Sequence, residues 1–301
     1  MKNPIALFKC KKVKKGWRFE KGKLSVLHFQ KPFSFKGSSL NKFFTFRFSL
    51  FAFHFSLFTF RFSLFTFHFS LINNMTIGVI VAMDKEFVQL RTILEQPIVE
   101  RKNGKDFVLG NIGTKRIVLQ KCGIGKVNSA IGAVEMINNY HPDLIVSSGC
   151  AGGADTSLNV TDVVVSTECC YHDAYCGSEQ EFGQIMGMPA RYASPSELVA
   201  KAAAVDCSVN VVPGLIVSGE WFVDSREKMA SILDRFPEAK AVDMESCSIA
   251  QTCHIYGVPF ISFRIISDVP LKDEKAQQYF DFWARMADGS FDVTKHFLDS
   301  L

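Results

Sequence analysis

Acidic side chains are almost absent from residues 1–74, where Glu20 stands alone against 14 lysines and arginines, a net charge of +13. Residues 75–301 have the opposite balance, with 29 acids against 20 lysines and arginines, a net charge of −9. Phenylalanine is divided as unevenly, because 18 of the 29 lie within residues 1–74. We therefore interpret the chain as two parts, residues 1–74 and a domain over residues 75–301. The acidity of the domain argues against nucleic acid as a partner, because phosphate binding requires a basic surface.

No two cysteines have the C-x-x-C spacing that is typical of structural metal sites. Eight of the nine cysteines lie in residues 75–301, several of them inside apolar runs where buried thiols are common. We interpret them as reduced thiols of a cytoplasmic protein and not as disulfides. We expect neither a metal nor another cofactor.

Residues 1–74 also lack the apolar core and the small-residue cleavage site of a signal peptide. A membrane helix there would carry Arg47 and Arg61, each costing roughly 2.5–3.5 kcal/mol near the centre of a bilayer. We therefore expect no membrane partner.

Residues 45–71 do contain a tandem repeat with a period of seven, Thr45-Phe-Arg-Phe-Ser-Leu-Phe51 followed by three close copies. An odd period turns successive phenylalanines to opposite faces of a strand, so the repeat gives no single buried face. A tandem DNA repeat would encode this pattern if it were translated. We interpret residues 1–74 as a low-complexity, basic, Phe-rich extension that is non-native or disordered, with a poorly folded anchor or targeting tail as the alternative. Met75 is then the start of the functional domain.

Apolar runs alternate with amphipathic stretches over residues 75–301. The pattern predicts strands at 76–82, 106–112, 115–122, 143–148, 162–170, 211–218, 239–243 and 258–267, and helices at 84–95, 126–139, 196–206, 225–235, 245–256 and 274–298. Such alternation indicates an α/β domain, a three-layer sandwich with a central twisted, mixed, largely parallel sheet. Ligands of such sheets bind where the carboxyl ends of the strands open into loops.

Three carboxylates follow three of the predicted strands, namely Glu86, Glu245 and Asp268. Each also has a purely structural interpretation, as a helix-terminal acid, a paired charge or a cap. Cleavage of a glycosidic bond uses an acid for the leaving group and a base for water. Three carboxylates at the ends of three different strands favour this chemistry.

Two glycine-rich segments lie between Glu86 and Glu245 in the sequence. Gly123-Ile-Gly-Lys126 is not a P-loop, because Gln120 occupies the position of its first glycine and Val127 that of its Ser/Thr. It indicates a tight turn near a ligand. Ser147–Gly153 is expected to leave the strand at 143–148, and its three glycines would let the backbone approach a small molecule.

Taken together, the motifs resemble those of the 5′-methylthioadenosine/S-adenosylhomocysteine nucleosidases of the purine nucleoside phosphorylase superfamily. The likeness runs from Met75 to the C-terminus through AMDKE (82–86), GIGK (123–126), GCAGG (149–153), YHDA (171–174), GLIVSG (214–219), VDMES (242–246) and RIISD (264–268). The resemblance implies a nucleoside phosphorylase-like fold, a homodimer and a small-molecule nucleoside substrate. It implies an N-glycosyl hydrolase that releases adenine from methylthioadenosine, adenosylhomocysteine and 5′-deoxyadenosine, in methionine salvage and methyl-cycle recycling.

The resemblance also assigns roles to individual residues. Glu86 activates the attacking water, whereas Asp268, oriented by Ser267, protonates or hydrogen-bonds adenine N7. Glu245 holds the ribose hydroxyls. Met244 packs on the sugar, Phe222 and Val223 contact adenine, and Gly152 with Cys150 and Ala151 forms the floor. Ile124, Met83 and an aromatic residue near Phe280 form the wall around the 5′ substituent. Arg264 lies behind the carboxylates.

Two residues depart from the family pattern. Cys150 stands where serine is usual, which removes a hydroxyl group near the water. Asp243 stands where glutamate is usual, which shortens a carboxylate that we expect beside the adenine pocket.

Three alternative functions share part of this pattern. A purine nucleoside phosphorylase would need cations where Glu86 stands. A non-catalytic nucleoside-binding protein would need neither Glu86 nor Asp268. A 6-amino-6-deoxyfutalosine nucleosidase would share the catalytic residues and differ only in the 5′ pocket, so it stays open as an additional or main activity.

We predict that a chain beginning at Met75 keeps full nucleosidase activity and is more soluble than the full-length chain. The reason is that exposed phenylalanines drive association. Adenine release and the soluble fraction measure the two properties, and mass spectrometry of the native protein should find an N-terminus at or just after Met75. Misfolding of the shorter chain, or native peptides from residues 45–71, would contradict the prediction.

Overall fold

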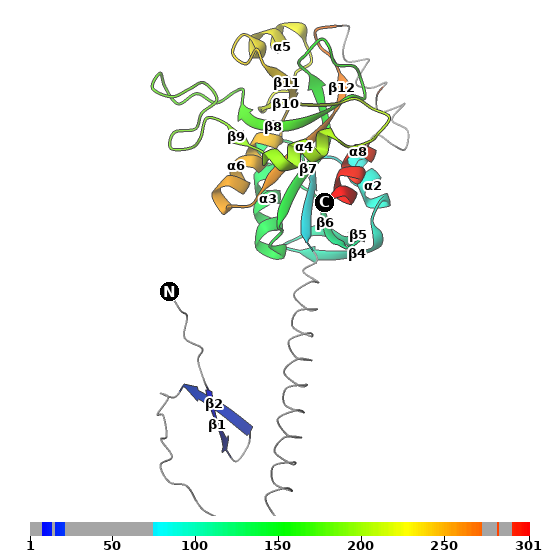
Figure 1. Ribbon diagram of the computed structural model, residues 1–301. Coiled ribbons are helices and arrows are strands. Elements are labelled where there is room, and N and C mark those ends of the chain that lie inside the picture. Colours follow the sequence, from blue (N-terminus) through cyan, green and yellow to red (C-terminus); the bar gives the residue numbers. More distant parts are fainter. Residues whose placement is uncertain (1–7, 14–15, 22–74, 273–281, 283–290) are drawn as a thin grey trace, which may run out of the picture. The chain divides into compact units, whose positions relative to one another are not determined.

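Figure 1 shows the computed structural model, which describes residues 8–13, 16–21, 75–272, 282 and 291–301. The chain divides into two units, Met1–Ile72 and Asn73–Leu301. In the first unit, β1 (Phe8–Val13) and β2 (Gly16–Lys21) form a two-stranded antiparallel sheet. The tandem repeat at 45–71 lies outside the described residues.

The second unit is built on one mixed sheet, which confirms the predicted α/β class. Its strand order is β11-β10-β8-β12-β7-β3-β6-β5-β4, with β9 beside β8. The strands are β3 (Thr76–Val81), β4 (Glu95–Lys102), β5 (Lys105–Ile112), β6 (Lys115–Lys121), β7 (Leu144–Gly153), β8 (Val163–Tyr171), β9 (Tyr192–Ala193), β10 (Val211–Ser218), β11 (Ala239–Asp243) and β12 (Phe260–Asp268).

The strands at the centre of the sheet, β6, β3, β7 and β12, run parallel to one another. Their side chains are mostly buried on both faces, as the apolar runs in the sequence predict. β11 pairs with β10 in parallel and with β7 antiparallel, so the pairings β7-β12-β8-β10-β11 close on themselves. This closure brings the carboxyl ends of β7, β11 and β12 to one place.

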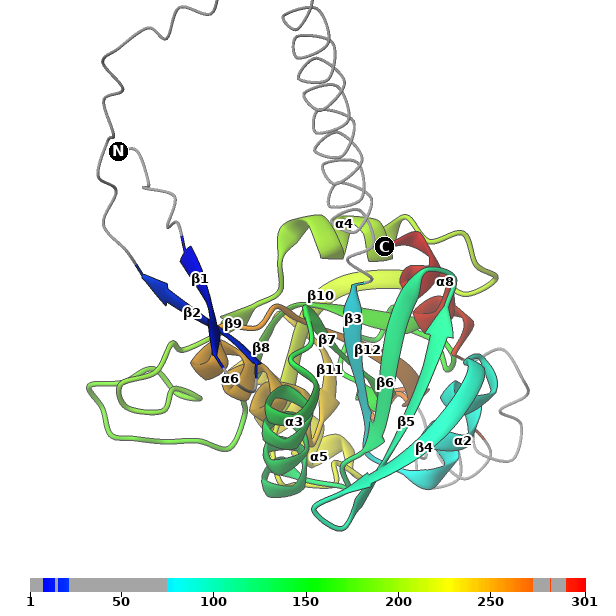
Figure 2. The same cartoon turned by 90° about the horizontal axis from the view of Figure 1, so that it is seen from below.

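Helices contribute residues to all three core clusters of buried side chains. The helices are α2 (Asp84–Thr92), α3 (Lys126–Tyr140), α4 (Ser196–Ala203), α5 (Arg226–Leu233), α6 (Ser246–Tyr256) and α8 (Asp292–Ser300). Residues of α3 and α6 pack in the cluster that contains Ile80 and Val118, whereas residues of α2, α4 and α8 pack in the cluster of Val79 and Leu119. Figure 2 shows α3 and α6 on one side of the strands and α2 and α8 on the other.

The structure departs from the predicted elements in several places, and the strands β1, β2 and β9 were not predicted. β4 was not predicted, because it is a largely exposed edge strand that contains Pro97 and lacks apolar alternation. β7 continues to Gly153 and does not end at residue 148, so the glycine-rich segment belongs to the strand. The predicted helix at 274–298 falls mostly outside the described residues, and α8 begins at Asp292. Within the part of the chain that is described, we found no helix both long and apolar enough to span a bilayer.

Candidate active site

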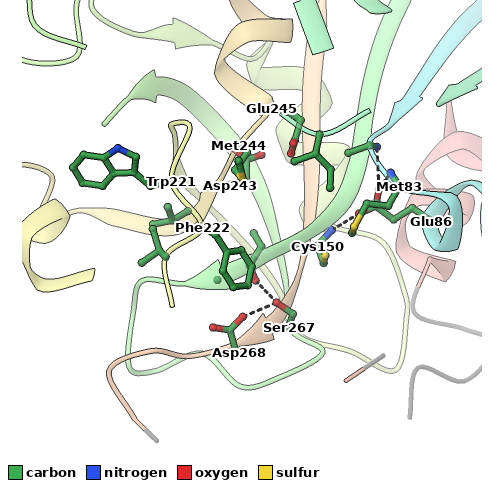
Figure 3. Close-up of a pocket in the computed structure, with 16 residues that line it drawn as sticks. Met83, Glu86, Cys150, Trp221, Phe222, Asp243, Met244, Glu245, Ser267 and Asp268 are labelled. Carbon is green, nitrogen blue, oxygen red and sulfur yellow. Dashed lines mark hydrogen bonds between the residues drawn. The ribbon is translucent and has the colours of Figure 1, made fainter. Parts of the chain in front are cut away.

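A cavity of about 320 Å³ lies at the carboxyl ends of β3, β7, β11 and β12 (Figure 3). The turn before α3 and the segment after β10 complete its wall. The residues that line it are Ala82, Met83, Glu86, Ile124, Cys150, Ala151, Gly152, Trp221, Phe222, Val223, Val242, Asp243, Met244, Glu245, Ser267 and Asp268. With the exception of Arg264, every site residue that we named from the sequence and that the structure describes is among them. Phe280 lies outside the described residues.

Strand register explains why these residues meet. Gly152 of β7 is paired with Asp268 of β12 on one side and with Val242 of β11 on the other. The segment that carries Met244 and Glu245 follows directly after β11. The end of β7 is therefore the floor on which two carboxylate-bearing strands converge.

Glu86 is 2% exposed, and backbone N–H groups hold both of its carboxylate oxygens. Oε2 accepts from Ala82 N and Met83 N at 2.9 Å, and Oε1 accepts from Cys150 N at 3.1 Å. Glu86 belongs to the capping box of its own helix α2, and its carboxylate also lines the cavity. Burial raises the pKa of Glu86, against the lowering effect of the backbone N–H groups and Arg264. A raised pKa makes the carboxylate a stronger proton acceptor.

The close approach of Glu86 to β7 requires a glycine at position 149. A Cβ atom there would lie 2.7 Å from Glu86 Oε1, too near for the carboxylate to stay. A glycine inside a strand often marks such an approach. Sequence analysis missed the role of Gly149 because it assigned the glycines to a loop.

Position 150 contacts Glu86 through its backbone N–H, a group that every residue except proline supplies. Burial raises the pKa of the Cys150 thiol well above its ordinary value, and the negative charge of Glu86 raises it further. The thiol is therefore protonated at neutral pH. Cysteine in place of the usual serine at position 150 therefore keeps the backbone hydrogen bond to the Glu86 carboxylate.

Asp268 ends β12 and is 7% exposed. Ser267 Oγ donates to Asp268 Oδ1 at 2.7 Å and lies 3.2 Å from Ala151 O. In Figure 3 the Asp268 carboxylate lies below Phe222, whereas Glu86 stands at the other side of the cavity. The two carboxylates are thus placed to act on different parts of one bound molecule.

Glu245 is 8% exposed and accepts a hydrogen bond from Gly125 N at 2.8 Å. Burial raises the pKa of Glu245, as does the negative charge of Asp243 beside it. Arg264 and the bond from Gly125 act in the opposite direction. Arg264 thus offsets part of the free-energy cost of burying two ionised glutamates, Glu86 and Glu245.

Arg264 lies behind the cavity and lines a small second cavity together with Glu86 and Glu245. Arg264 Nε donates to Asp243 Oδ2 at 2.5 Å, and Nη2 donates to Ser147 Oγ at 2.9 Å. Asp243 also accepts from the hydroxyl groups of Ser218 and Ser246. Asp243 lines the cavity, and its carboxylate is engaged by Arg264 and the two serines.

The apolar wall includes residues to which sequence analysis gave no role. Val242 and Trp221 line the cavity beside Phe222, and Phe222 itself is 56% exposed. The tryptophan is held by an edge-to-face contact with His172, at 5.3 Å between ring centroids. Among the residues that the structure describes, no group of three or more His, Cys, Asp or Glu side chains is arranged to hold a metal ion.

The fold and the site together define the class of this protein. A family model described as the phosphorylase superfamily matches residues 76–299, so the chain belongs to that superfamily. The chain is 39% identical over 203 residues to the 5′-methylthioadenosine/S-adenosylhomocysteine nucleosidase of Bacillus thuringiensis, a match that covers 66% of this chain and 88% of the relative. It therefore belongs to the 5′-methylthioadenosine/S-adenosylhomocysteine nucleosidase family, as the motifs predict.

Solved structures agree with this assignment. The nucleosidase of Neisseria meningitidis, in complex with methylthio-immucillin-A, is 37% identical with a TM-score of 0.70, over 75% of this chain and 99% of that one. Futalosine hydrolase of Helicobacter pylori is 28% identical with a TM-score of 0.69, over 75% of this chain and 98% of that one.

Proposed function

We propose that this protein hydrolyses the N-glycosidic bond of 5′-methylthioadenosine and S-adenosylhomocysteine and releases adenine. The observation that carries the proposal is the buried Glu86 carboxylate, which three backbone N–H groups fix at one side of the cavity while Asp268 stands at the other. A base for water and an acid for the leaving group are the two groups that glycoside hydrolysis requires.

The geometry supports a division of roles. Glu86 takes a proton from water as the water oxygen bonds to C1′ of the ribose. The electron pair of the breaking C1′–N9 bond passes to adenine, and Asp268 supplies a proton to N7 so that adenine leaves neutral. Glu245 holds the ribose hydroxyls, and the apolar wall of Phe222, Val223, Met244 and Ile124 takes adenine, the sugar and the 5′ substituent.

The position of Glu86 disfavours a phosphorylase. A phosphate ion in place of the water would stand against this carboxylate, and two like charges about 4 Å apart cost on the order of 4 kcal/mol at an effective dielectric of 20. Lys85, the nearest cation in the sequence, is exposed at the start of α2. Arg264 is already engaged by Asp243.

A futalosine-type substrate is the second candidate. The likeness to the futalosine hydrolase of Helicobacter pylori favours it, because that protein shares the fold over most of this chain. The two candidates differ at the 5′ side of the substrate, where Ile124 and Met83 stand. Comparing kcat/KM for methylthioadenosine, adenosylhomocysteine and 6-amino-6-deoxyfutalosine decides between them.

The proposal extends to substrate range and setting. We include 5′-deoxyadenosine among the substrates and place the enzyme in the cytoplasm, in methionine salvage and methyl-cycle recycling. The unit Asn73–Leu301 supports the proposal that residues 75–301 carry the whole activity. Two of the three core clusters contain alternate residues of β3 and β6, and this supports a three-layer arrangement of the unit.

We predict that adenine release from methylthioadenosine is equally fast with and without phosphate. Water is the nucleophile if Glu86 has the role proposed, and phosphate then contributes nothing. Adenine and methylthioribose are measured by chromatography in phosphate-free buffer and again with added phosphate. Formation of a ribose 1-phosphate would identify a phosphorylase and refute the proposal.

We predict that Glu86→Gln and Asp268→Asn each lower kcat by at least about 10²–10⁴-fold, the usual range for a general base or acid. Asp84→Asn is a matched control for Glu86, because Asp84 lies in the same helical turn but its side chain is 81% exposed. Single-turnover rates of the three variants and the unaltered enzyme measure the effect. Near-normal turnover by either of the first two variants would show that the site is misplaced.

A homodimer is part of the proposal, and a set of exposed apolar side chains supports it. Val127 and Ile131 lie four positions apart on α3, so they share one face of the helix. Tyr175 and Met186 lie on the long segment between β8 and β9. These four side chains are 69%, 46%, 65% and 68% exposed, in that order. We propose that a second copy of the chain covers them and closes the 5′ side of the pocket.

We predict that Ile131→Glu weakens the dimer and raises KM for methylthioadenosine, because a carboxylate buried between two subunits is costly. Val99→Glu is the control, since Val99 is 51% exposed but lies on the edge strand β4. Sedimentation at several concentrations measures the oligomeric state. An unaltered enzyme that is monomeric and fully active in dilute solution would argue against the dimer.

A further inference from the structure

Two loops contribute residues to the cavity wall. The loop 123–126 contributes Ile124 to the wall and the Gly125 N–H to the Glu245 carboxylate. The segment 219–223 contributes Trp221, Phe222 and Val223. The first loop therefore supports the ribose side of a bound nucleoside and the second its base side, and the relative position of the two sets how the nucleoside fits.

Asp173 joins these loops. Its Oδ1 and Oδ2 each accept from Lys126 Nζ at 2.9 Å, and Oδ2 also accepts from Glu220 N at 2.9 Å. Glu220 Oε1 in turn accepts from Lys126 N at 2.6 Å, which closes a ring of contacts among three segments. The Asp173 side chain is 10% exposed and that of Lys126 28%, so solvent screens this ion pair less than an ordinary surface pair.

Asp173 is held in place by its neighbour His172. His172 N donates to Ser218 O at 2.9 Å, and the imidazole ring packs against Trp221. Burial lowers the pKa of His172, which keeps the ring neutral as a packing group. A Cβ atom at Gly219 would lie 2.4 Å from this ring, so position 219 must be glycine. Residues 172–173 and the segment after β10 therefore interlock independently of the ion pair.

Gly125, in the loop 123–126, is a second position where a close contact requires glycine. Its φ of 93° favours glycine, and a Cβ atom there would lie 2.6 Å from Glu220 Oε2. Gly125 thus stands between two carboxylates, with Glu245 on its N–H group and Glu220 against its Cα atom. Displacing Glu220 or Lys126 would move the donor on which Glu245 depends.

We propose that Asp173 is a positioning residue that locks the loop 123–126 to the segment 219–223 and thereby sets the affinity of the cavity for its nucleoside. The proposal rests on the nucleosidase function proposed above and deepens it. The ion pair contacts neither the reacting atoms nor the cavity, so its effect passes through Gly125 and Glu245 on one side and through Trp221 and Phe222 on the other.

Two measurable effects follow for Asp173→Asn. We expect KM for methylthioadenosine to rise about tenfold while kcat changes less than about threefold, because contacts to ribose and base are present before and during the reaction.

We also expect the acid limb of the pH profile of kcat/KM to move to higher pH. The groups that face Glu245 are Asp243, Arg264, Glu86, Cys122 and Cys150, with Gly125 N as a donor that lowers its pKa. Losing that donor lets Glu245 protonate at a higher pH.

The test compares the full chain with Asp173→Asn, Lys126→Met, the double variant and Glu238→Gln. Glu238 forms an ion pair with Arg191 elsewhere on the surface, so its variant controls for loss of an ion pair as such. If Asp173 and Lys126 act as one unit, the double variant is no worse than either single one. If Asp173→Asn does not fold, Lys126→Met carries the same two expectations.

Normal KM and an unmoved acid limb in the folded variants would overturn the proposal, even if their thermal stability fell. An unaltered enzyme that releases no adenine would instead refute the proposed function. In that case, calorimetric measurement of methylthioadenosine binding tests the positioning role of Asp173 by itself. We expect Asp173→Asn to bind about tenfold more weakly than the unaltered protein, and equal binding would contradict the proposal.

Discussion

The buried ion pair between Arg264 and Asp243 is the constraint on which the site depends. Their side chains are 3% and 1% exposed, and an unpaired charge at such a depth would cost several kcal/mol. Ser147, Ser218 and Ser246 complete the hydrogen bonds of the pair. With its own charge held in place, Arg264 lowers the pKa values of Glu86 and Glu245, which burial alone would raise further. Arg264 thus offsets part of the effect of burial on both acids, although the pKa of each remains raised.

Backbone N–H groups supply the other contacts that hold these acids, and glycines admit the carboxylates to them. Glu86 reaches Cys150 N only because Gly149 has no side chain, and Glu245 accepts from Gly125, whose φ favours glycine. A backbone N–H group carries no net charge and cannot rotate away as a side chain can. These donors therefore hold the carboxylates in place without neutralising their charge. The glycine-rich motifs of the sequence therefore act here on carboxylates of the protein itself.

Sequence reasoning recovered the α/β class and most strands, because central strands such as β3 and β12 are apolar almost throughout. It also gathered Glu86, Glu245 and Asp268, since all three follow strands whose ends must meet in such a sheet; their catalytic roles stay predictions. It missed β4, whose exposed residues show no pattern, and it placed Gly149 in a loop. The resemblance had placed Arg264 behind the carboxylates, but the serine partners of Asp243 could not be predicted, because Ser218 and Ser246 come from different elements and only the fold brings them together.

The segment Gly123–Lys126 shows how a motif can resemble a phosphate loop and yet be built for another purpose. It opens α3, and a helix N-terminus presents free N–H groups that favour negative charge. In this chain two of those groups already bind carboxylates, Gly125 N to Glu245 and Lys126 N to Glu220, while Lys126 Nζ pairs with Asp173. Three carboxylates from other parts of the fold thus stand around the turn where an anion would bind. A phosphate group would have to displace one of these carboxylates. The turn is therefore better suited to hold the protein's own acids around a neutral nucleoside. A hydrolase that uses water does not require a phosphate site at this turn.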